Sequence, residues 1–382
     1  MPPIRVLHLF SNSKWTGPAE PALNLCVALR GLGVDARFAC APDAGASVNM
    51  VVATAHDRGV EPVLSFRLNK HRNPWHNFLD RRAMRRWIAA ERPDLIHCHL
   101  DNDPEIALAP AAAAGVPLVR SSYAGEGFPD TPRHRRLVAG TALLLEPSEL
   151  ARKNDTALFG VPGERMAVVP GAVDTERFDP RRETPDGRRR LTLPPDAFVL
   201  GIVARMQTHR HYEDLFGAFA RLAAENPRAH LVVVGRGTNQ KTVGFEPVRR
   251  LGLADRVHFT GYIAGEDYVG MLRAFDAGVL LVPGSDGTCR AVREVLAMGR
   301  PMVVADRGML AEIVADGQTG LVCDGTPDGL HAAFAALAAD RARRAALGRN
   351  ARATAEARHA LPVQAAQVLS LYERVLRRTA TA

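Results

Sequence analysis

Two carboxylates, Asp286 and Glu294, stand eight positions apart between two short apolar runs, residues 277–283 and 301–305. The first run is typical of a buried strand, and a loop of small residues follows it. A helix that begins near Cys289 would carry Glu294 about a turn and a half from its start. Such a turn presents backbone N–H groups and the positive end of a helix to an anion. A phosphate flanked by carboxylates that bind hydroxyl groups indicates a nucleotide-sugar ligand.

Two arginines could supply the positive charge that a diphosphate needs. Arg205 and Arg210 follow the expected strand 198–203, at the carboxyl end of a strand, where open α/β sheets bind their ligands. Two guanidinium groups there can clamp a diphosphate and stabilise it as it leaves with extra negative charge. Surface arginines on a loop are the alternative interpretation. The Gly-Arg-Gly sequence 235–237 adds weak evidence, because many strand-to-helix turns need glycine.

The elements that must position these residues follow a repeating pattern. Apolar runs alternate with amphipathic segments, which indicates parallel sheets built from βαβ units. In the first half, candidate strands lie at 4–10, 36–41, 61–66, 94–98, 116–120, 142–146 and 166–169. After a polar linker, the second half has candidate strands at 198–203, 230–234, 256–260, 277–282, 301–305 and 320–323. The sequence predicts two Rossmann-like, doubly wound α/β domains that face each other across a cleft.

The length of the chain supports two domains, because 382 residues exceed what a single core usually holds. The polar stretch 179–190 is rich in Arg, Pro and Asp and marks the linker. We therefore expect an N-terminal domain over residues 1–180 and a C-terminal domain over residues 181–361. The last helix, 362–382, is expected to join the N-terminal domain.

Composition limits the class of protein. The net charge is +8, spread over both halves without a long basic tail, so a nucleic-acid partner is not expected. Anionic small molecules or anionic lipid head groups fit the same bias, and so does an arginine-rich proteome. The five cysteines form no CxxC pair, and their odd number argues against a disulfide framework. We find no signal-peptide pattern and no long apolar run, so we expect a cytoplasmic chain without a membrane span.

The motifs follow one another in a recognisable order. In the second half this order is Val-Ala-Arg205, the basic Arg210, Val-Val-Val-Gly235, Val-His-Phe-Thr-Gly261-Tyr262, the acid pair, and Gly-Arg-Pro-Met-Val-Val at 299–304. The first half adds Trp-Thr-Gly17-Pro-Ala-Glu20, Pro-Asp-Leu-Ile-His97-Cys-His99 and Val-Val-Pro-Gly-Ala-Val-Asp174. The chain resembles the retaining family 4 glycosyltransferases, also called glycosyl transferase group 1, which have the GT-B fold. The resemblance covers nearly the whole chain.

The resemblance implies roles for the acids and the loop between them. Glu294 matches an acid that accepts hydrogen bonds from the ribose hydroxyls of a nucleoside-diphosphate sugar. Asp286 stands where the family usually has a glutamate beside the transferred sugar, and it is one methylene shorter. The loop would hold a phosphate or a sugar hydroxyl through the backbone N–H groups of Gly287, Thr288, Cys289 and Arg290. Arg290 would either add charge at the diphosphate or point to solvent, and Cys289 lacks a base that would make it a nucleophile.

The remaining site residues also follow from the resemblance. Arg205 and Arg210 match the family's cations that neutralise the diphosphate leaving group, and no cofactor besides the donor sugar is implied. Gly17 permits close backbone approach, and Tyr262 is expected to contact substrate. Tyr123 stands where the family commonly has a histidine. A further set of alternatives concerns His99, which either lines the acceptor site or has a structural role.

No metal site is expected. The sequence Asp101-Asn102-Asp103 superficially resembles an Asp-x-Asp metal site. A helix N-cap at Asp103, directly before Pro104, explains this sequence better. The two arginines already supply the charge that a divalent cation would otherwise provide.

The resemblance implies a retaining, metal-independent glycosyltransferase that moves a sugar from a nucleoside-diphosphate sugar to a glycan or lipid-linked glycan acceptor. Lipopolysaccharide or another cell-surface glycan is the expected acceptor, from the resemblance and the basic charge. Two alternatives stay open. One is an epimerase or hydrolase of the same fold, and the other is a catalytically weak protein that binds nucleotide-sugars.

One basic segment offers a membrane contact. Residues 71–87 contain Arg72, Trp75, Phe78, Arg81, Arg82, Arg85, Arg86 and Trp87. Cations and aromatics on one helix can lie at an anionic bilayer surface, which would place the protein on the inner face of a membrane. An ordinary helix packed by Phe78, Met84 and Ile88 is the favoured interpretation.

Overall fold

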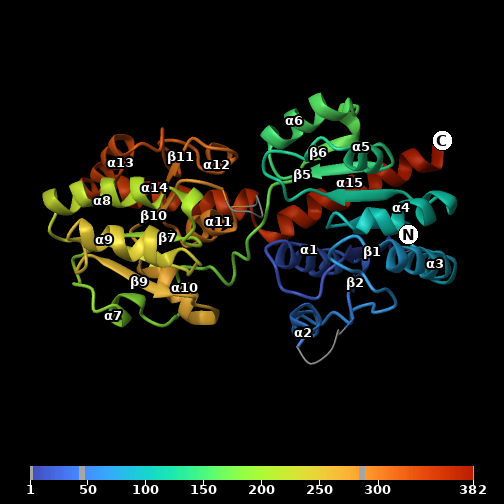
Figure 1. Ribbon diagram of the computed structural model, residues 1–382, viewed down its shortest axis with the longest axis horizontal. Helices are drawn as coiled ribbons and strands as arrows, with labels where there is room; N and C mark the ends of the chain where they lie inside the picture. The colour runs from blue at the N-terminus through green and yellow to red at the C-terminus, as the bar shows by residue number, and fades with distance from the viewer. Residues whose placement is uncertain (1–2, 43–47, 284–288, 382) are drawn as a thin grey trace. The chain divides into compact units, whose positions relative to one another are not determined.

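The computed structural model describes residues 3–42, 48–283 and 289–381. The chain divides into two compact units (Figure 1). Unit 1 contains the chain up to Gly171 together with the helix from Leu361, and unit 2 contains the described residues from Ala172 to Ala360. Among the described residues, no helix is both long enough and apolar enough to span a bilayer.

Unit 1 is built on a six-stranded parallel sheet with the order β2-β1-β3-β4-β5-β6. Its strands are β1 (Arg5–Phe10), β2 (Asp35–Cys40), β3 (Leu95–Cys98), β4 (Leu118–Ser121), β5 (Leu143–Glu146) and β6 (Met166–Val168). Its helices are α1 (Ala19–Gly31), α2 (Met50–Asp57), α3 (Pro74–Glu91), α4 (Asp103–Ala113), α5 (Pro132–Ala139), α6 (Glu149–Phe159) and α15 (Leu361–Thr381). A short 3₁₀ turn, Gly163–Arg165, precedes β6.

The core of unit 1 lies on both faces of this sheet, because successive side chains of a strand point to opposite faces. Val6 and Phe10 of β1 pack with α1 and α15 on one face. Leu7 and Leu9 pack with α3 and α4 on the other face. His8 lies between Leu7 and Leu9 in the strand, so the same alternation directs it toward the α15 face.

Unit 2 repeats this architecture with a six-stranded parallel sheet in the order β12-β11-β10-β7-β8-β9. Its strands are β7 (Phe198–Val203), β8 (Ala229–Val234), β9 (Val257–Gly261), β10 (Ala277–Leu280), β11 (Met302–Ala305) and β12 (Gly320–Cys323). Its helices are α7 (Gly187–Arg190), α8 (Tyr212–Glu225), α9 (Glu246–Arg250), α10 (Gly265–Ala274), α11 (Arg290–Ala297), α12 (Leu310–Ile313), α13 (Pro327–Ala339) and α14 (Arg341–Arg358). A 3₁₀ turn, Thr208–Arg210, and a π turn, Lys241–Phe245, complete the unit.

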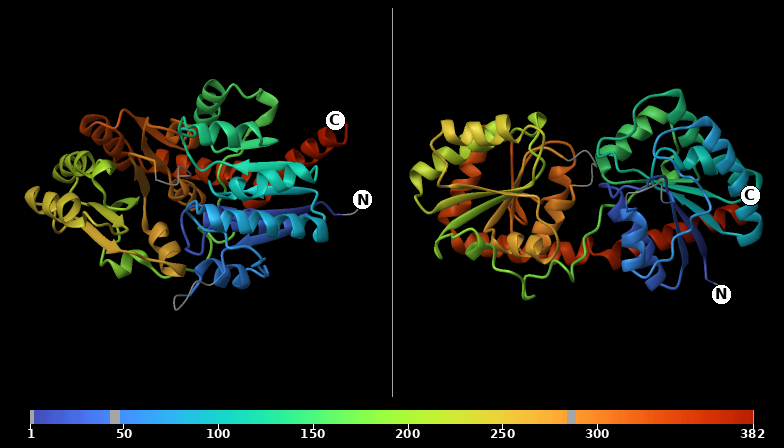
Figure 2. Two further views of the ribbon diagram at one scale, coloured as in Figure 1. Left: turned by 45° about the vertical axis from the view of Figure 1, so that its right-hand side comes forward. Right: turned by 60° about the horizontal axis from the view of Figure 1, so that its bottom comes forward.

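Helices cover both faces of each sheet (Figure 2). In unit 2, α10, α11 and α14 pack on one face, and α8 and α13 pack on the other. Both sheets are parallel and doubly wound, so the predicted fold class of two α/β domains is confirmed.

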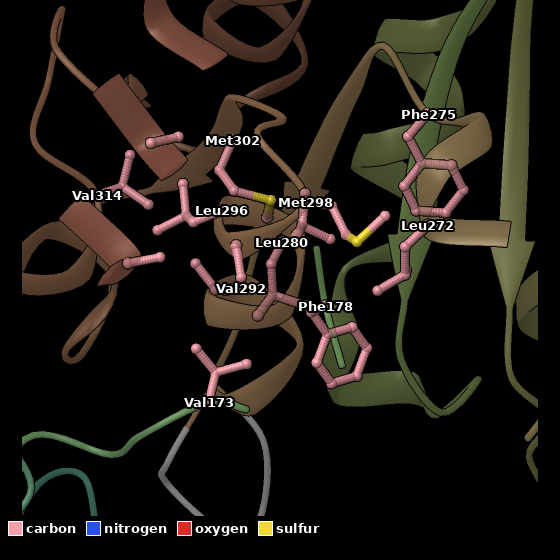
Figure 3. Packing of buried hydrophobic residues seen from close by; sticks show 14 of the residues in the cluster. Val173, Phe178, Leu272, Phe275, Leu280, Val292, Leu296, Met298, Met302 and Val314 are labelled. Atoms are coloured by element: carbon pink, nitrogen blue, oxygen red, sulfur yellow. The ribbon is translucent and has the colours of Figure 1, made fainter. Parts of the chain in front are cut away.

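Two predicted segments differ from the structure. Residues 61–66 form no strand, because Val63 makes a single bridge to Ala39 and the preceding Pro62 has no N–H group to extend the ladder. The unit boundary lies after Gly171, before the predicted boundary at 180, because the intervening residues pack with unit 2. Phe178 is buried in its core (Figure 3), and Arg352 of α14 donates hydrogen bonds to the carbonyls of Thr175 and Phe178.

The strand that leads to Arg205 depends on a glycine. A Cβ atom at Gly201 in β7 would overlap the ring of Phe275, which is fully buried beside it. We predict that Gly201→Ala lowers the free energy of unfolding by about 1 to 3 kcal/mol, because the packed ring has to move. The measurement is denaturant unfolding followed by circular dichroism.

A matched control is Gly217→Ala on helix α8, where an added Cβ meets nothing within 4 Å. It should leave stability unchanged or raise it by up to about 1 kcal/mol, because alanine favours helix more than glycine does. If Gly201→Ala and the unchanged protein unfold at the same denaturant concentration, the ring of Phe275 does not restrict this position.

Candidate active site

The strand order of unit 2 identifies where its ligand can bind. β7 lies between β10 and β8, so the chain leaves β7 toward one side of the sheet and leaves β10 toward the other. Such a switch point opens a binding position outside the carboxyl ends of the two strands. Arg205 and Arg210 follow β7, and the segment that leads to Glu294 follows β10. The topology therefore brings the arginines and the carboxylate predicted from the sequence to the same edge of the sheet.

Two glycines shape the loop that carries Arg205. A Cβ atom on Gly235 would overlap the carbonyl oxygen of Ala204, and one on Gly237 would overlap that of Met206. Gly235 also has a φ of +132°, which side chains rarely permit. The Gly-Arg-Gly sequence is thus required by close approach to the residues on either side of Arg205. Arg205 itself is exposed.

Arg210 connects the two loops of the switch point. Its side chain is 8% exposed, and its Nη1 atom donates a hydrogen bond to the carbonyl oxygen of Val282 at 2.9 Å. The hydroxyl of Tyr212 donates to the carbonyl oxygen of Ala204 at 3.1 Å. The bond from Arg210 holds the loop after β7 against the chain that leaves β10, and the bond from Tyr212 closes that loop on itself. His209 and His211 are exposed, as loop histidines are expected to be.

Glu294 is a buried carboxylate on the second turn of α11. Its side chain is 6% exposed, and its Oε2 atom accepts a hydrogen bond from the hydroxyl of Tyr268 on α10. Arg290, one turn earlier, pairs with Oε1 at 3.2 Å. This ion pair was not among the alternatives weighed for Arg290 from the sequence, and its charge at a diphosphate stays a prediction. A buried charge needs such partners, because desolvation alone would disfavour it.

The loop between the two acids is only partly described. Asp286, Gly287 and Thr288 lie outside the described residues, so their predicted contacts remain predictions. Cys289 has φ 47° and ψ 42°, a left-handed conformation directly before α11. Its side chain is buried in the core of unit 2, which does not suit a nucleophile.

Tyr262 is far from buried. It follows β9 and is 71% exposed, with the guanidinium of Arg236 5.7 Å from the centre of its ring. Arg236 follows β8, so this pair lies with the exposed Arg205 at the carboxyl ends of the strands. Arg236 was not singled out from the sequence, although it lies inside the Gly-Arg-Gly motif.

Unit 1 has its own switch point, between β1 and β3. Gly17 lies in the turn before α1, which follows β1, and His99 directly follows β3. Tyr123 follows β4, the next strand in the sheet. The hydroxyl of Tyr123 lies 2.8 Å from Nδ1 of His99, so two of the predicted acceptor-side residues are hydrogen-bonded partners.

Three buried histidines form a cluster behind Tyr123. His8 Nδ1 lies 2.9 Å from His99 Nε2, and His97 hydrogen bonds with the hydroxyls of Ser121 and Tyr372. Among the described residues, these histidines are the one group of three His, Cys, Asp or Glu side chains close enough to share a metal ion. Both ring nitrogens of His97 and His99 already have hydrogen-bond partners, and the two rings stack with centroids 4.3 Å apart. The cluster is therefore arranged as a hydrogen-bond network.

The donors and acceptors of this histidine network can be assigned. Burial lowers the pKa of His8 to about 3 and holds the pKa values of His97 and His99 well below their usual range, so all three rings are neutral. Among the described residues, Nε2 of His8 has no hydrogen-bond partner. A buried N–H without a partner is rarer than a buried acceptor without one, so we assign the proton of His8 to Nδ1. His8 then donates to His99, and His99 donates to the oxygen of Tyr123.

The acidic sequence at 101–103 holds loops together. Asp103 is the first residue of α4, and its carboxylate accepts hydrogen bonds from the backbone N–H groups of Ser11, His99 and Leu100 at 2.7 to 2.8 Å. The predicted N-cap at Asp103 is wrong by one residue, because Asn102 occupies that position. Asp101 pairs with Arg120 at 2.6 Å. Both carboxylates therefore have protein partners, and neither belongs to a group that could share a metal ion among the described residues.

Sequence reasoning missed two residues that hold the site. Tyr268 lies 26 positions before Glu294, and nothing in its local sequence indicated that contact. His8 interrupts the apolar run Val-Leu-His-Leu-Phe, and this polar residue in a buried strand was the available signal.

Comparison with known proteins matches both halves of the chain to families. Residues 183–354 match the family described as glycosyl transferases group 1, and residues 16–177 match glycosyltransferase family 4. A D-inositol 3-phosphate glycosyltransferase of Stackebrandtia nassauensis is 33% identical over 69% of this chain and 65% of its own length. One of the same name from Kribbella flavida is 30% identical over 71% of this chain and 69% of its own length. The first of these alignments thus spans less than two thirds of the relative.

Solved structures match nearly the whole fold. A glycosyltransferase from Rickettsia africae ESF-5 superposes with a TM-score of 0.83 at 13% identity, covering 98% of this chain and 99% of that one. HepE of Anabaena in complex with UDP-glucose superposes with a TM-score of 0.73 at 18% identity, covering 99% of each chain. At these identities the likeness shows the fold alone.

The buried histidines make the stability of unit 1 depend on pH. Each has a pKa near 6.5 when unfolded, and His8 takes up a proton in the folded protein only near pH 3. Below pH 6.5 the unfolded chain therefore binds protons that the folded chain does not. The contribution of these histidines to the free energy of unfolding should therefore fall as the pH falls below 6.5, by up to about 1.4 kcal/mol per pH unit for each histidine.

The variant His8→Gln tests this prediction. The free energy of unfolding of the variant should fall less steeply with falling pH, by about 1.4 kcal/mol per pH unit, because one buried histidine is removed. Tryptophan fluorescence reports on unit 1, since all three tryptophans, Trp15, Trp75 and Trp87, lie in it. Burial raises the pKa of Asp103 to about 7 and also raises the pKa values of Glu146 and Asp155. These acids add stability as the pH falls, but they do so equally in both proteins, so their effect cancels in the comparison. Parallel slopes for the two proteins would show that folded His8 is charged, contrary to the prediction.

Proposed function

This chain belongs to the family 4 glycosyltransferases, and we propose that it transfers a sugar from a nucleoside-diphosphate sugar to an acceptor hydroxyl with retention of configuration. The observation that carries the proposal is the buried carboxylate of Glu294, held by Tyr268 and Arg290 at the switch point that also presents Arg205. A buried, fixed acid beside strand ends that carry cations is what a ribose linked to a diphosphate requires.

In this proposal Glu294 accepts hydrogen bonds from the ribose hydroxyls. A carboxylate has about four acceptor positions, so Tyr268 and Arg290 can hold it while the ribose binds. Arg205 and Arg210 neutralise the diphosphate, whose charge grows as the bond to the sugar breaks. They would supply the charge that a divalent cation supplies in other sites. The complex of HepE with UDP-glucose supports a nucleotide-sugar donor for a protein of this fold.

The chemical step proposed is front-face displacement. The acceptor oxygen bonds to the anomeric carbon on the face from which the diphosphate oxygen departs, and the acceptor's proton passes to that leaving oxygen. Asp286 is proposed to lie near the sugar and support the positive charge that develops at the anomeric carbon. No protein nucleophile is needed in such a step, which agrees with the burial of Cys289 in the core.

Two acceptor classes are candidates. A lipopolysaccharide or another cell-surface glycan is the acceptor proposed from the resemblance, and solved structures of this fold include a lipopolysaccharide outer core galactosyltransferase. The relatives at 30 to 33% identity are named for D-inositol 3-phosphate, which favours a phosphorylated cyclitol as the second candidate.

A panel of UDP-, GDP- and ADP-sugars, each with and without D-inositol 3-phosphate or a lipopolysaccharide core oligosaccharide, tests the proposal. We expect release of nucleoside diphosphate from one donor, dependent on acceptor. We expect Arg205→Ala to lower kcat/KM by roughly a hundredfold, because it removes a cation from the leaving group.

The control variant is Arg228→Ala. Arg228 precedes β8, at the opposite end of the same sheet, and forms an exposed ion pair with Asp196 that contributes little to stability. Its activity should equal that of the unchanged protein. Donor conversion without acceptor would favour an epimerase or hydrolase, and binding of a donor without turnover would favour a binding protein.

A further inference from the structure

Helix α3 presents an exposed stripe of aromatic and cationic side chains. At 100° per residue, one arc of roughly 100° on this helix holds its exposed Trp, Phe and Arg residues. In chain order these are Trp75, Phe78, Arg82, Arg85 and Arg86, all exposed. Trp75 is 66% exposed and Phe78 is 49% exposed, and their rings stack with centroids 5.8 Å apart. We refer to these five residues as the α3 stripe.

The packed side of α3 does not include the aromatic stripe. Met84 and Ile88 are buried against the sheet of unit 1, as predicted, together with Asn77 and Asp80. Phe78 was predicted to pack with them, and this prediction is wrong because Phe78 is displaced around the helix from these residues and lies on its exposed side. Two stacked aromatic rings in water forgo the burial that usually stabilises such residues, so this pair is a candidate contact surface.

The acids of α3 leave the stripe purely cationic. The buried carboxylate of Asp80 accepts hydrogen bonds from the backbone N–H groups of Arg67 and Leu68 at 2.9 and 3.0 Å. Glu91, at the end of the helix, forms an ion pair with Arg37 at 2.6 Å. Both acids thus belong to the side of α3 that faces the protein, and three arginines remain on the exposed side without an acid among them.

We propose that the α3 stripe binds the surface of an anionic lipid bilayer, with Trp75 and Phe78 inserted at the level of the head groups and the arginines against lipid phosphates. An aromatic pair next to a row of cations matches the interface of such a bilayer, which is apolar below and negative above. The helix lies along the surface and does not cross it, in agreement with the absence of a spanning helix among the described residues. This surface does not depend on the proposed sugar transfer.

Flotation with vesicles tests the proposal on the full chain. The protein is mixed with phosphatidylcholine vesicles or with vesicles that contain about one third phosphatidylglycerol, and the bound fraction is measured. We expect binding to the anionic vesicles only, weakened by salt. Arg82→Gln/Arg85→Gln/Arg86→Gln should weaken partitioning roughly a hundredfold, since each cation near such a surface contributes about a factor of five.

A control with the same change in net charge is Arg341→Gln/Arg343→Gln/Arg349→Gln on α14, where all three arginines are exposed. This control should bind vesicles as the unchanged protein does. If both triple variants lose binding equally, net charge and not the α3 stripe is responsible, and the proposal fails.

The aromatic pair separates a bilayer from other polyanions. Trp75→Ser/Phe78→Ser should abolish most vesicle binding, and Leu251→Ser, a comparably exposed apolar residue of unit 2, should not. Undiminished vesicle binding by the aromatic variant would show a surface for anions in general, such as nucleic acid or an acidic protein, and would overturn the bilayer proposal. Unchanged circular dichroism spectra confirm that each variant is folded.

Discussion

A parallel sheet offers ligands one position that its topology leaves open, where neighbouring strands send the chain to opposite sides. In unit 2 this position lies between β7 and β10, and in unit 1 it lies between β1 and β3. Arg205 and Glu294 follow β7 and β10, and His99 follows β3, so the topology brings predicted site residues to these positions. The rest of the structure serves to hold the loops at these strand ends in place.

Different interactions hold the loops at the strand ends in the two units. In unit 2, close contacts of Gly235 and Gly237 with backbone shape one loop, and Arg210 bonds it to the chain beyond β10. Glu294 would be a costly buried charge without Tyr268 and Arg290, since a carboxylate loses most of its hydration on burial. In unit 1, uncharged histidines and the carboxylate of Asp103 perform this task. The C-terminal helix contributes to it, because Tyr372 is a partner of His97.

Much of this arrangement could be predicted from the sequence. Short apolar runs predicted all twelve strands of the two sheets, and the position of Glu294 on a helix after β10 followed from local pattern alone. The failures arose where long-range packing decides. Phe178 belongs to unit 2 because of distant partners such as Arg352, which donates a hydrogen bond to its carbonyl oxygen. Phe78 is exposed because Asp80 and Met84 occupy the packed side of α3. The partner of Glu294 and the direction of the histidine network depend on tertiary contacts that no local pattern encodes.

Calorimetric titration shows whether Glu294 recognises the ribose hydroxyls of a nucleotide. The chain and its Glu294→Gln variant are each titrated with the nucleoside diphosphate that binds best and with its 2′,3′-dideoxy analogue. We expect the unchanged protein to bind the dideoxy analogue roughly 10- to 100-fold more weakly, because hydrogen bonds to a charged group are lost. We expect the variant to distinguish the two ligands much less. Equal affinity of the unchanged protein for both ligands would show that Glu294 does not recognise the ribose.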